Sequence, residues 1–118
     1  MEVSNIIISD NMIEIVCSGR VSSFDLKNLI DTVKSLLQEK KEVKNILLDL
    51  TGIEGKLGFM EHFKLGEEIA GKLSGFRLAV VTKPIVVNKT AENVAKKKGA
   101  IMLMTYDRKE ALSWFVNK

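Results

Sequence analysis

The sequence predicts one α/β domain with a mixed, mostly parallel sheet and an antiparallel N-terminal strand, in the order β-β-α-β-α-β-α-β-α. Short segments rich in Ile, Val and Leu alternate with segments whose apolar residues recur at helical spacing. Such alternation is typical of right-handed parallel crossovers. The length of 118 residues suits one hydrophobic core, so we expect a single domain over residues 1–118.

The chain is expected to open with two antiparallel strands. The segments Glu2–Ser9 and Met12–Gly19 are rich in Ile and Val, and only Asp10 and Asn11 separate them. Residues of these two types tolerate positive φ and suit a tight hairpin turn. We therefore predict a hairpin that contributes the antiparallel strand of the sheet.

The first helix has both a start signal and an amphipathic pattern. Ser22 is followed three residues later by Asp25, which is a capping-box pattern. Apolar residues then recur at helical spacing up to about Lys40: Leu26, Leu29, Ile30, Val33, Leu36 and Leu37.

The rest of the chain alternates strands with helices. The continuous apolar runs predict buried strands at Ile46–Leu50, Arg77–Thr82 and Ile101–Thr105. Helical spacing predicts helices that begin at Phe59, Asn88 and Asp107, the first two ending near Gly75 and Gly99. Between the first of these strands and its helix we expect a glycine-rich loop, Thr51–Gly58.

Composition argues against several classes of function. The net charge is +3 and acidic residues are interspersed among the basic ones, which does not favour nucleic-acid binding. The single Cys17 and the single His62 exclude an intrachain disulfide and an all-Cys/His zinc site. Cys17 has apolar neighbours and is expected to be a buried, inert thiol. No apolar run is long enough to span a membrane and no signal peptide is recognised, so we expect a cytoplasmic protein.

The sequence also gives little support for catalysis. Only two residues separate Gly52 from the Gly55-Lys56 pair, and Leu57 follows the lysine, so the loop lacks the spacing and the hydroxyl of a phosphate-binding P-loop. His62 lies near the edge of an apolar stripe and is expected to be structural. We predict no catalytic residue, no metal and no cofactor. An enzyme would instead need a cluster of polar groups with perturbed pKa values in one cleft.

The carboxyl ends of the parallel strands are the expected place for partners or ligands. Three apolar residues, Ile85 to Val87, fall in the connection after one strand, where connections usually run over the surface. They either pack beneath a helix or form an apolar patch. The predicted partner-binding residues at this rim are Gly52, Glu54, Lys56, Phe59, Met60, Ile85 and Val86. The charged members would give specificity and the apolar ones would act as anchors.

Several segments together resemble a known family. They are Ile46–Gly52, which ends in Leu-Asp-Leu-Thr-Gly, the helix start at Phe59–Gly66, Gly75–Val81, and the closing Asp107–Phe115. Over nearly its whole length the chain resembles the STAS family, the anti-sigma-factor-antagonist fold, and more closely its SpoIIAA-like branch.

The resemblance implies a non-enzymatic module of bacterial signalling or regulation that docks a protein partner through the loop and helix after the central strand. In the phosphorylated members a serine at the start of that helix is modified. Residues 54–58 contain no Ser or Thr, so no phosphorylation is expected at the usual position. The related lipid-transfer fold implies an alternative, a carrier or sensor of a lipid or other small apolar ligand. A homodimer, with a contribution from Trp114, is a further option.

Overall fold

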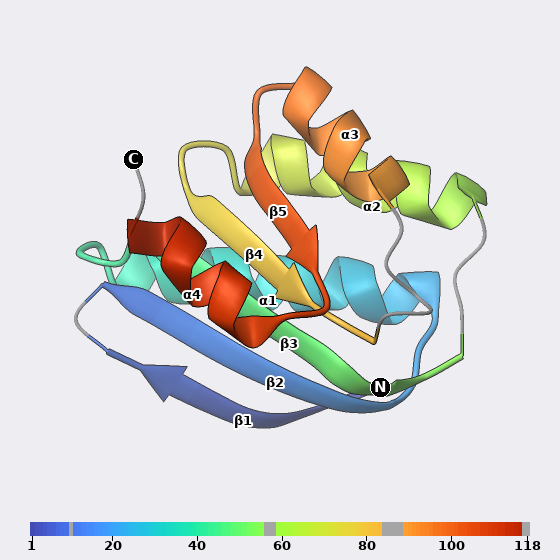
Figure 1. The fold of residues 1–118 in the computed structure, drawn as a ribbon, viewed down its shortest axis with the longest axis horizontal. Helices are drawn as coiled ribbons and strands as arrows, with labels where there is room; N and C mark the ends of the chain where they lie inside the picture. The colour runs from blue at the N-terminus through green and yellow to red at the C-terminus, as the bar shows by residue number, and fades with distance from the viewer. Residues whose placement is uncertain (10, 56–58, 84–88, 117–118) are drawn as a thin grey trace.

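The computed structural model describes residues 1–9, 11–55, 59–83 and 89–116, and within them the elements follow the predicted order (Figure 1). The strands are β1 (Glu2–Ile8), β2 (Met12–Arg20), β3 (Asn45–Glu54), β4 (Arg77–Val81) and β5 (Ile101–Thr105). The helices are α1 (Ser23–Glu39), α2 (Phe59–Lys72), α3 (Lys89–Lys97) and α4 (Arg108–Val116). Among these helices none has the length and apolar character needed to cross a membrane.

The strands form one five-stranded sheet in the order β1-β2-β3-β4-β5. β1 is antiparallel to β2, and every other neighbouring pair is parallel, which confirms the predicted fold class. At the hairpin the Ser9 amide donates to the Met12 carbonyl at 2.9 Å, while Asp10 lies outside the described residues.

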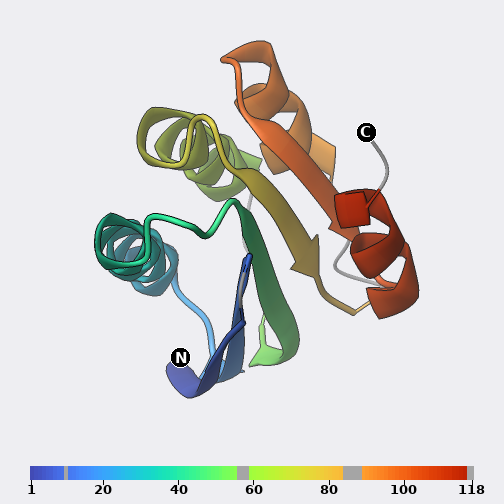
Figure 2. The ribbon, with the colours of Figure 1, turned by 90° about the vertical axis from the view of Figure 1, so that its left-hand side faces the viewer.

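Helices cover the two faces of the sheet unequally. Parallel crossovers of one hand that advance in one direction across a sheet place their helices on the same face. Accordingly α1, α2 and α3 pack on one face and α4 packs on the other (Figure 2). The larger core lies under α1–α3 and includes wholly buried Ile13, Ile15, Val33 and Ile46. A smaller cluster lies under α4 and consists of Leu47, Ala79, Val81 and Ala111, with Met12, Trp114 and Phe115 packed against it.

The start of α1 shows the predicted capping box. The Asp25 amide donates to Ser22 Oγ at 3.2 Å, and the Ser22 amide donates to Asp25 Oδ2 at 3.1 Å. The two contacts satisfy donors that the first turn of a helix otherwise leaves without a partner.

One prediction about the central strand was wrong. We expected the strand to end at Leu50 and a loop to begin at Thr51, but β3 continues to Glu54. The extension is paired with the long strand β2: Gly52 lies opposite Ser18, and Glu54 lies opposite Arg20, after an irregularity in the register. Two of the predicted site residues, Gly52 and Glu54, therefore belong to the end of a strand.

Helix α3 buries a charged residue that the sequence pattern did not indicate. Ala91 and Ala95 face the core, and so does Glu92, with 6% of its surface exposed. Its carboxylate lies 2.8 Å from Lys89 Nζ and accepts a hydrogen bond from the Met104 amide at 3.4 Å. Ion pairing and a backbone donor thus compensate the cost of burying this charge.

Candidate functional site

The predicted site lies at the carboxyl ends of the parallel strands, where β3 leads toward α2. Glu54 is exposed at the end of β3, and its carbonyl accepts a hydrogen bond from the Val21 amide at 2.9 Å. Phe59 and Met60 are the first two residues of α2. Their side chains lie outside the described part of the chain, as do the predicted residues Lys56, Ile85 and Val86.

Gly52 has a packing role that explains the absence of a side chain. A Cβ at this position would lie 3.1 Å from the Cys17 carbonyl oxygen and 3.3 Å from Ser18 Cβ. Such contacts are tighter than normal, so a side chain here would require β2 to shift by a few tenths of an ångström, and glycine avoids that shift. Gly52 therefore fixes where the exposed Glu54 emerges from the sheet.

The middle of β3, where its pairing with β4 ends and its register with β2 shifts, carries a local hydrogen-bond pair. Asp49 Oδ1 accepts hydrogen bonds from the Thr51 amide at 3.0 Å and from Thr51 Oγ1 at 2.6 Å. A side chain of this type can bond backbone and hydroxyl groups two residues on. The Asp49 carboxylate is thus engaged within β3, at the irregularity in its pairing with β2.

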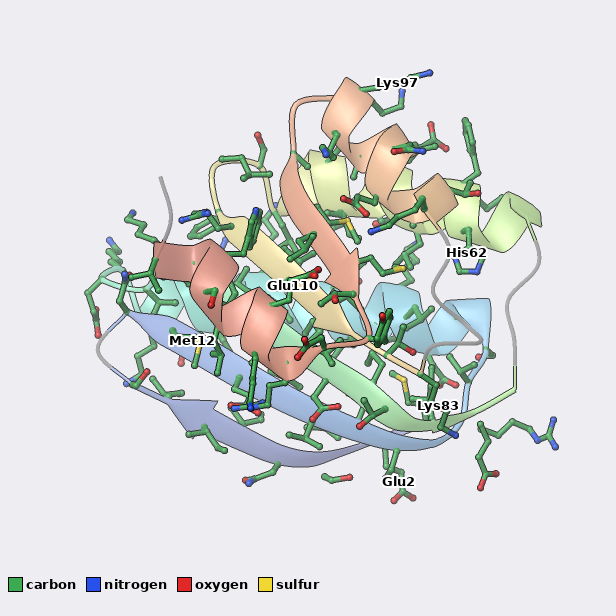
Figure 3. All side chains as sticks on the ribbon, viewed as in Figure 1. Glu2, Met12, His62, Lys83, Lys97 and Glu110 are labelled. Atoms are coloured by element: carbon green, nitrogen blue, oxygen red, sulfur yellow. The ribbon has the colours of Figure 1, made fainter. Side chains whose placement is uncertain are left out.

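A lysine joins the ends of β3 and β4. Lys83 Nζ donates to the Ile53 carbonyl at 3.1 Å (Figure 3). Because the acceptor belongs to the backbone near Glu54, this contact helps to keep the rim in place. Sequence analysis gave no structural role to Lys83.

Cys17 and His62 occupy the environments that the sequence predicted. Cys17 is wholly buried, and burial, together with the nearby Asp49 charge, raises the pKa of its thiol to about 11. This confirms the predicted burial of Cys17, and a buried thiol with a raised pKa is expected to be unreactive. His62, on α2, is half-buried (Figure 3). Among the residues that the structure describes, no three His, Cys, Asp or Glu side chains are grouped so as to hold a metal ion.

A surface groove between α1 and α2 was not predicted. Its volume is about 360 Å³. It is lined by Phe24, Leu26 and Lys27 from α1 and by Lys64, Leu65, Glu67 and Glu68 from α2. Phe24 is 70% exposed, whereas Leu26 is buried in the core. The groove thus has an apolar floor that continues into the core and an exposed aromatic ring on its wall.

Ion pairs hold the two helices together beside this groove. Lys72 Nζ contacts Asp31 Oδ1 across the helices and lies 2.8 Å from Glu68 Oε2 on its own helix. The hydrogen bond from Lys72 lowers the pKa of Asp31, and the same bond raises the pKa of Lys72. These contacts fix the relative position of α1 and α2, and with it the shape of the groove.

The glutamates that line the groove form ion pairs with described residues, whereas the lysines that line it do not. Glu68 is paired with Lys72, and Glu67 Oε2 lies 3.8 Å from Lys98 Nζ. Lys27 and Lys64 are exposed, and neither forms an ion pair with another described residue. Among the described residues, the groove side chains that lack an ion pair are therefore these two lysines.

Sequence analysis missed the groove because it considered only the stripe of apolar residues in α1 that recur at helical spacing. Phe24 stands two residues before Leu26, which is the first residue of the stripe, and so lies off it. An aromatic residue on the polar side of an amphipathic helix was the available signal.

No family model matches the chain, and no curated protein matches it at a significant level. The resemblance to the STAS family therefore stays a prediction based on the residues quoted above.

Proposed function

We propose that this chain is a non-enzymatic, STAS-like protein-interaction module of bacterial signalling or regulation. It docks its partner on the surface that follows the central strand β3, along helix α2. The observation that carries this proposal is the groove between α1 and α2, with its apolar floor and the 70% exposed Phe24 beside it. Exposed aromatic residues next to a preformed apolar groove are typical anchors of protein interfaces.

The charges of the groove suggest the chemistry of the partner. The apolar floor suits an apolar side chain of an amphipathic helix, as in helix-in-groove recognition. Lys27 and Lys64, two exposed lysines that line the groove, suit acidic residues on the flank of that helix. The proposed partner segment is therefore an amphipathic helix with an apolar anchor and acidic neighbours.

The non-enzymatic part of the proposal is supported by the state of the polar groups near the rim. Cys17, the single thiol, is buried with its pKa raised to about 11, which disfavours the nucleophilic thiolate. Asp49 accepts both hydrogen bonds from Thr51 and is thus engaged within β3.

The test compares two exposed aromatic residues at different places on the surface. The wild-type chain is used to capture and identify a partner, and the purified partner is then titrated calorimetrically against each variant. Phe24→Asp should weaken binding by at least about tenfold, as expected for loss of an anchor. Tyr106→Asp, at a residue that is 65% exposed and outside the groove, should bind like wild type.

Charge reversal provides a second, independent comparison. Lys27→Glu together with Lys64→Glu should weaken binding, and the loss should shrink at high salt, because the interaction with acidic residues is screened. Equal binding by wild type and Phe24→Asp, with thermal stability unchanged, would contradict docking in the groove. The variant Lys56→Glu with Met60→Asp extends the test to the rim residues beyond the groove.

A carrier of a small apolar ligand is the second candidate. The groove volume of about 360 Å³ falls within the range of small-molecule sites, roughly 300–1,000 Å³. Four charged side chains around the groove favour a protein segment over a lipid tail. Mass spectra of the purified protein, native and then denatured, distinguish the two candidates. A discrete extra mass that is lost on denaturation would support the carrier, and a mass equal to a whole number of chains would count against it.

A further inference from the structure

Strand β1 is an end strand of the sheet with an unusually apolar surface. It is the first strand in the sheet order and lies at the border of the fold (Figure 1). All seven of its residues are exposed. Four of them are large and apolar and are 40–47% exposed: Val3, Ile6, Ile7 and Ile8.

The half of β1 from Asn5 to Ile8 lacks the features that normally protect a sheet edge. Natural edge strands are commonly blunted by Lys, by Pro, by β-bulges or by inward-pointing charges. The sequence of β1, EVSNIII, contains one charged residue, Glu2, at its beginning. The register with β2 shifts between Val3 and Asn5, and from Asn5 to Ile8 it is regular. The regular half of the strand is therefore the apolar half.

The hairpin shows which backbone groups of β1 face outward. The Ser9 amide bonds to the Met12 carbonyl, and in an antiparallel pair alternate residues exchange hydrogen bonds with the neighbour. Ile7, two residues before Ser9, therefore directs its amide and carbonyl toward β2. The amides and carbonyls of Ile6 and Ile8 point toward the free edge.

We propose that β1 pairs with β1 of a second copy of this chain, antiparallel and around a two-fold axis at Ile7. In this register Ile6 exchanges backbone hydrogen bonds with Ile8 of the second copy, and Ile8 does so with Ile6. The two Ile7 side chains meet as a non-hydrogen-bonded pair, where side chains lie closest. The two sheets then form one continuous sheet of ten strands.

A second copy fits this edge because the edge is complementary to itself. Three consecutive isoleucines face the same three in reverse order, so apolar side chains meet on both faces of the sheet. Ile6 and Ile8 lie beside buried Ile15 and Ile13, and their cluster would extend the main core across the axis. Glu2, the one charge of the strand, lies away from the axis, so like charges are kept apart. Closed two-fold symmetry requires this kind of self-complementary surface.

The first test measures the mass in solution by sedimentation velocity over a range of concentrations. Wild type should be a dimer that dissociates on dilution. Ile7→Lys should be a monomer, because two lysines would face each other at the axis. The matched control is Ile101→Lys, since Ile101 is 45% exposed on β5, at the opposite edge of the sheet, and this variant should remain a dimer.

The second test checks the register by disulfide cross-linking. Across the proposed axis the two Ile7 Cα atoms are about 4.5 Å apart, which is within disulfide range. The two Asn5 Cα atoms would be roughly 14 Å apart along the strands, which is out of range. Mild oxidation should therefore give a covalent dimer of Ile7→Cys and leave Asn5→Cys monomeric. Cys17 is present in both variants and is wholly buried.

Three results would overturn the proposal: a wild-type monomer at all concentrations, a dimer that Ile7→Lys leaves intact, or open-ended larger assemblies. A monomer that instead captures an extended apolar segment of another protein on β1 would show that the edge serves a different partner. The proposal is independent of the groove between α1 and α2, so Phe24→Asp should leave the dimer unchanged.

Discussion

Arg108 in the first turn of α4 forms a two-pronged ion pair with Glu14 on β2, which lies 94 residues earlier in the chain. The Nη1–Oε2 distance is 2.5 Å and the Nη2–Oε1 distance is 2.7 Å. The Glu14 residue is only 6% exposed, and its hydrogen bonds raise the pKa of Arg108 above the usual value. The pair joins the helix that covers one face of the sheet to a strand near the sheet edge.

The first prediction concerns this ion pair. Arg108→Met should lower the free energy of unfolding by about 1–3 kcal/mol, because it leaves a buried carboxylate without its partner. The double variant Glu14→Met with Arg108→Met should recover most of the loss, since it removes the buried charge as well. Urea denaturation of wild type and the two variants measures both effects. A double variant no more stable than Arg108→Met would contradict this account of the pair.

The second prediction concerns two glycines of the same helix. A Cβ at Gly66 would lie 2.6 Å from the Ala91 carbonyl oxygen and 2.8 Å from Val94 Cβ, so α2 and α3 touch at this point. Gly66→Ala should therefore destabilise the fold by about 1–3 kcal/mol through overpacking.

Gly71 is the matched control, since a Cβ there would have no neighbour within 4 Å. Gly71→Ala should stabilise the protein by about 0.5–1 kcal/mol, because alanine loses less backbone entropy in a helix. Thermal unfolding of the two variants gives the comparison. Equal shifts of the melting temperature for the two substitutions would argue against close contact between α2 and α3.

Local signals in the sequence were enough to predict most elements. Asp10-Asn11 between two β-rich segments predicted the hairpin, and the Ser22/Asp25 pattern placed the start of α1 within one residue. Both signals depend only on residues that are neighbours in sequence, because a hairpin turn and a helix cap each involve a few consecutive residues. The alternation of strands and helices then leaves few topologies, which is why the fold class could be predicted.

Features that depend on distant partners could not be predicted in this way. Residues 51–54 resemble a glycine-rich loop, and only pairing with β2 makes them a strand. Glu14 and Glu92 interrupt apolar patterns, and their burial depends on Arg108, on Lys89 and on the Met104 amide. The groove beside Phe24 exists only once α1 and α2 pack together.

The third prediction concerns pH and the contact between Asp31 and Lys72. The pKa of Asp31 is lowered in the fold, so its contribution is complete above its ordinary pKa, near about 4, and is lost as the pH falls through the lowered value. The pKa of Lys72 is raised, so its contribution is complete below about 10.4 and is lost as the pH rises through the raised value. The contact between Asp31 and Lys72 should therefore stabilise the fold over the whole pH range from about 4 to about 10.4.

The measurement is the melting temperature of wild type and Asp31→Asn as a function of pH. The difference should be greatest near neutral pH and should shrink in acid and in strong base. It should also decrease at high salt, because Asp31 is exposed and Lys72 is only half-buried. A difference that is constant from acid to neutral pH would show that the carboxylate charge is not the cause.

The fourth prediction concerns the reactivity of Cys17. The side chain is wholly buried in the main core, and its pKa is raised to about 11, so almost no thiolate is present near neutral pH. A disulfide reagent at mildly alkaline pH should therefore label the folded protein very slowly and the urea-unfolded protein at the rate of a free cysteine. Labelling of the folded protein requires transient unfolding that exposes Cys17, so its rate should follow the equilibrium constant for unfolding. The rate should therefore be higher in Arg108→Met, by the factor by which that substitution raises this equilibrium constant. Rapid labelling of the folded wild type would contradict both the burial of Cys17 and the assignment of an inert thiol.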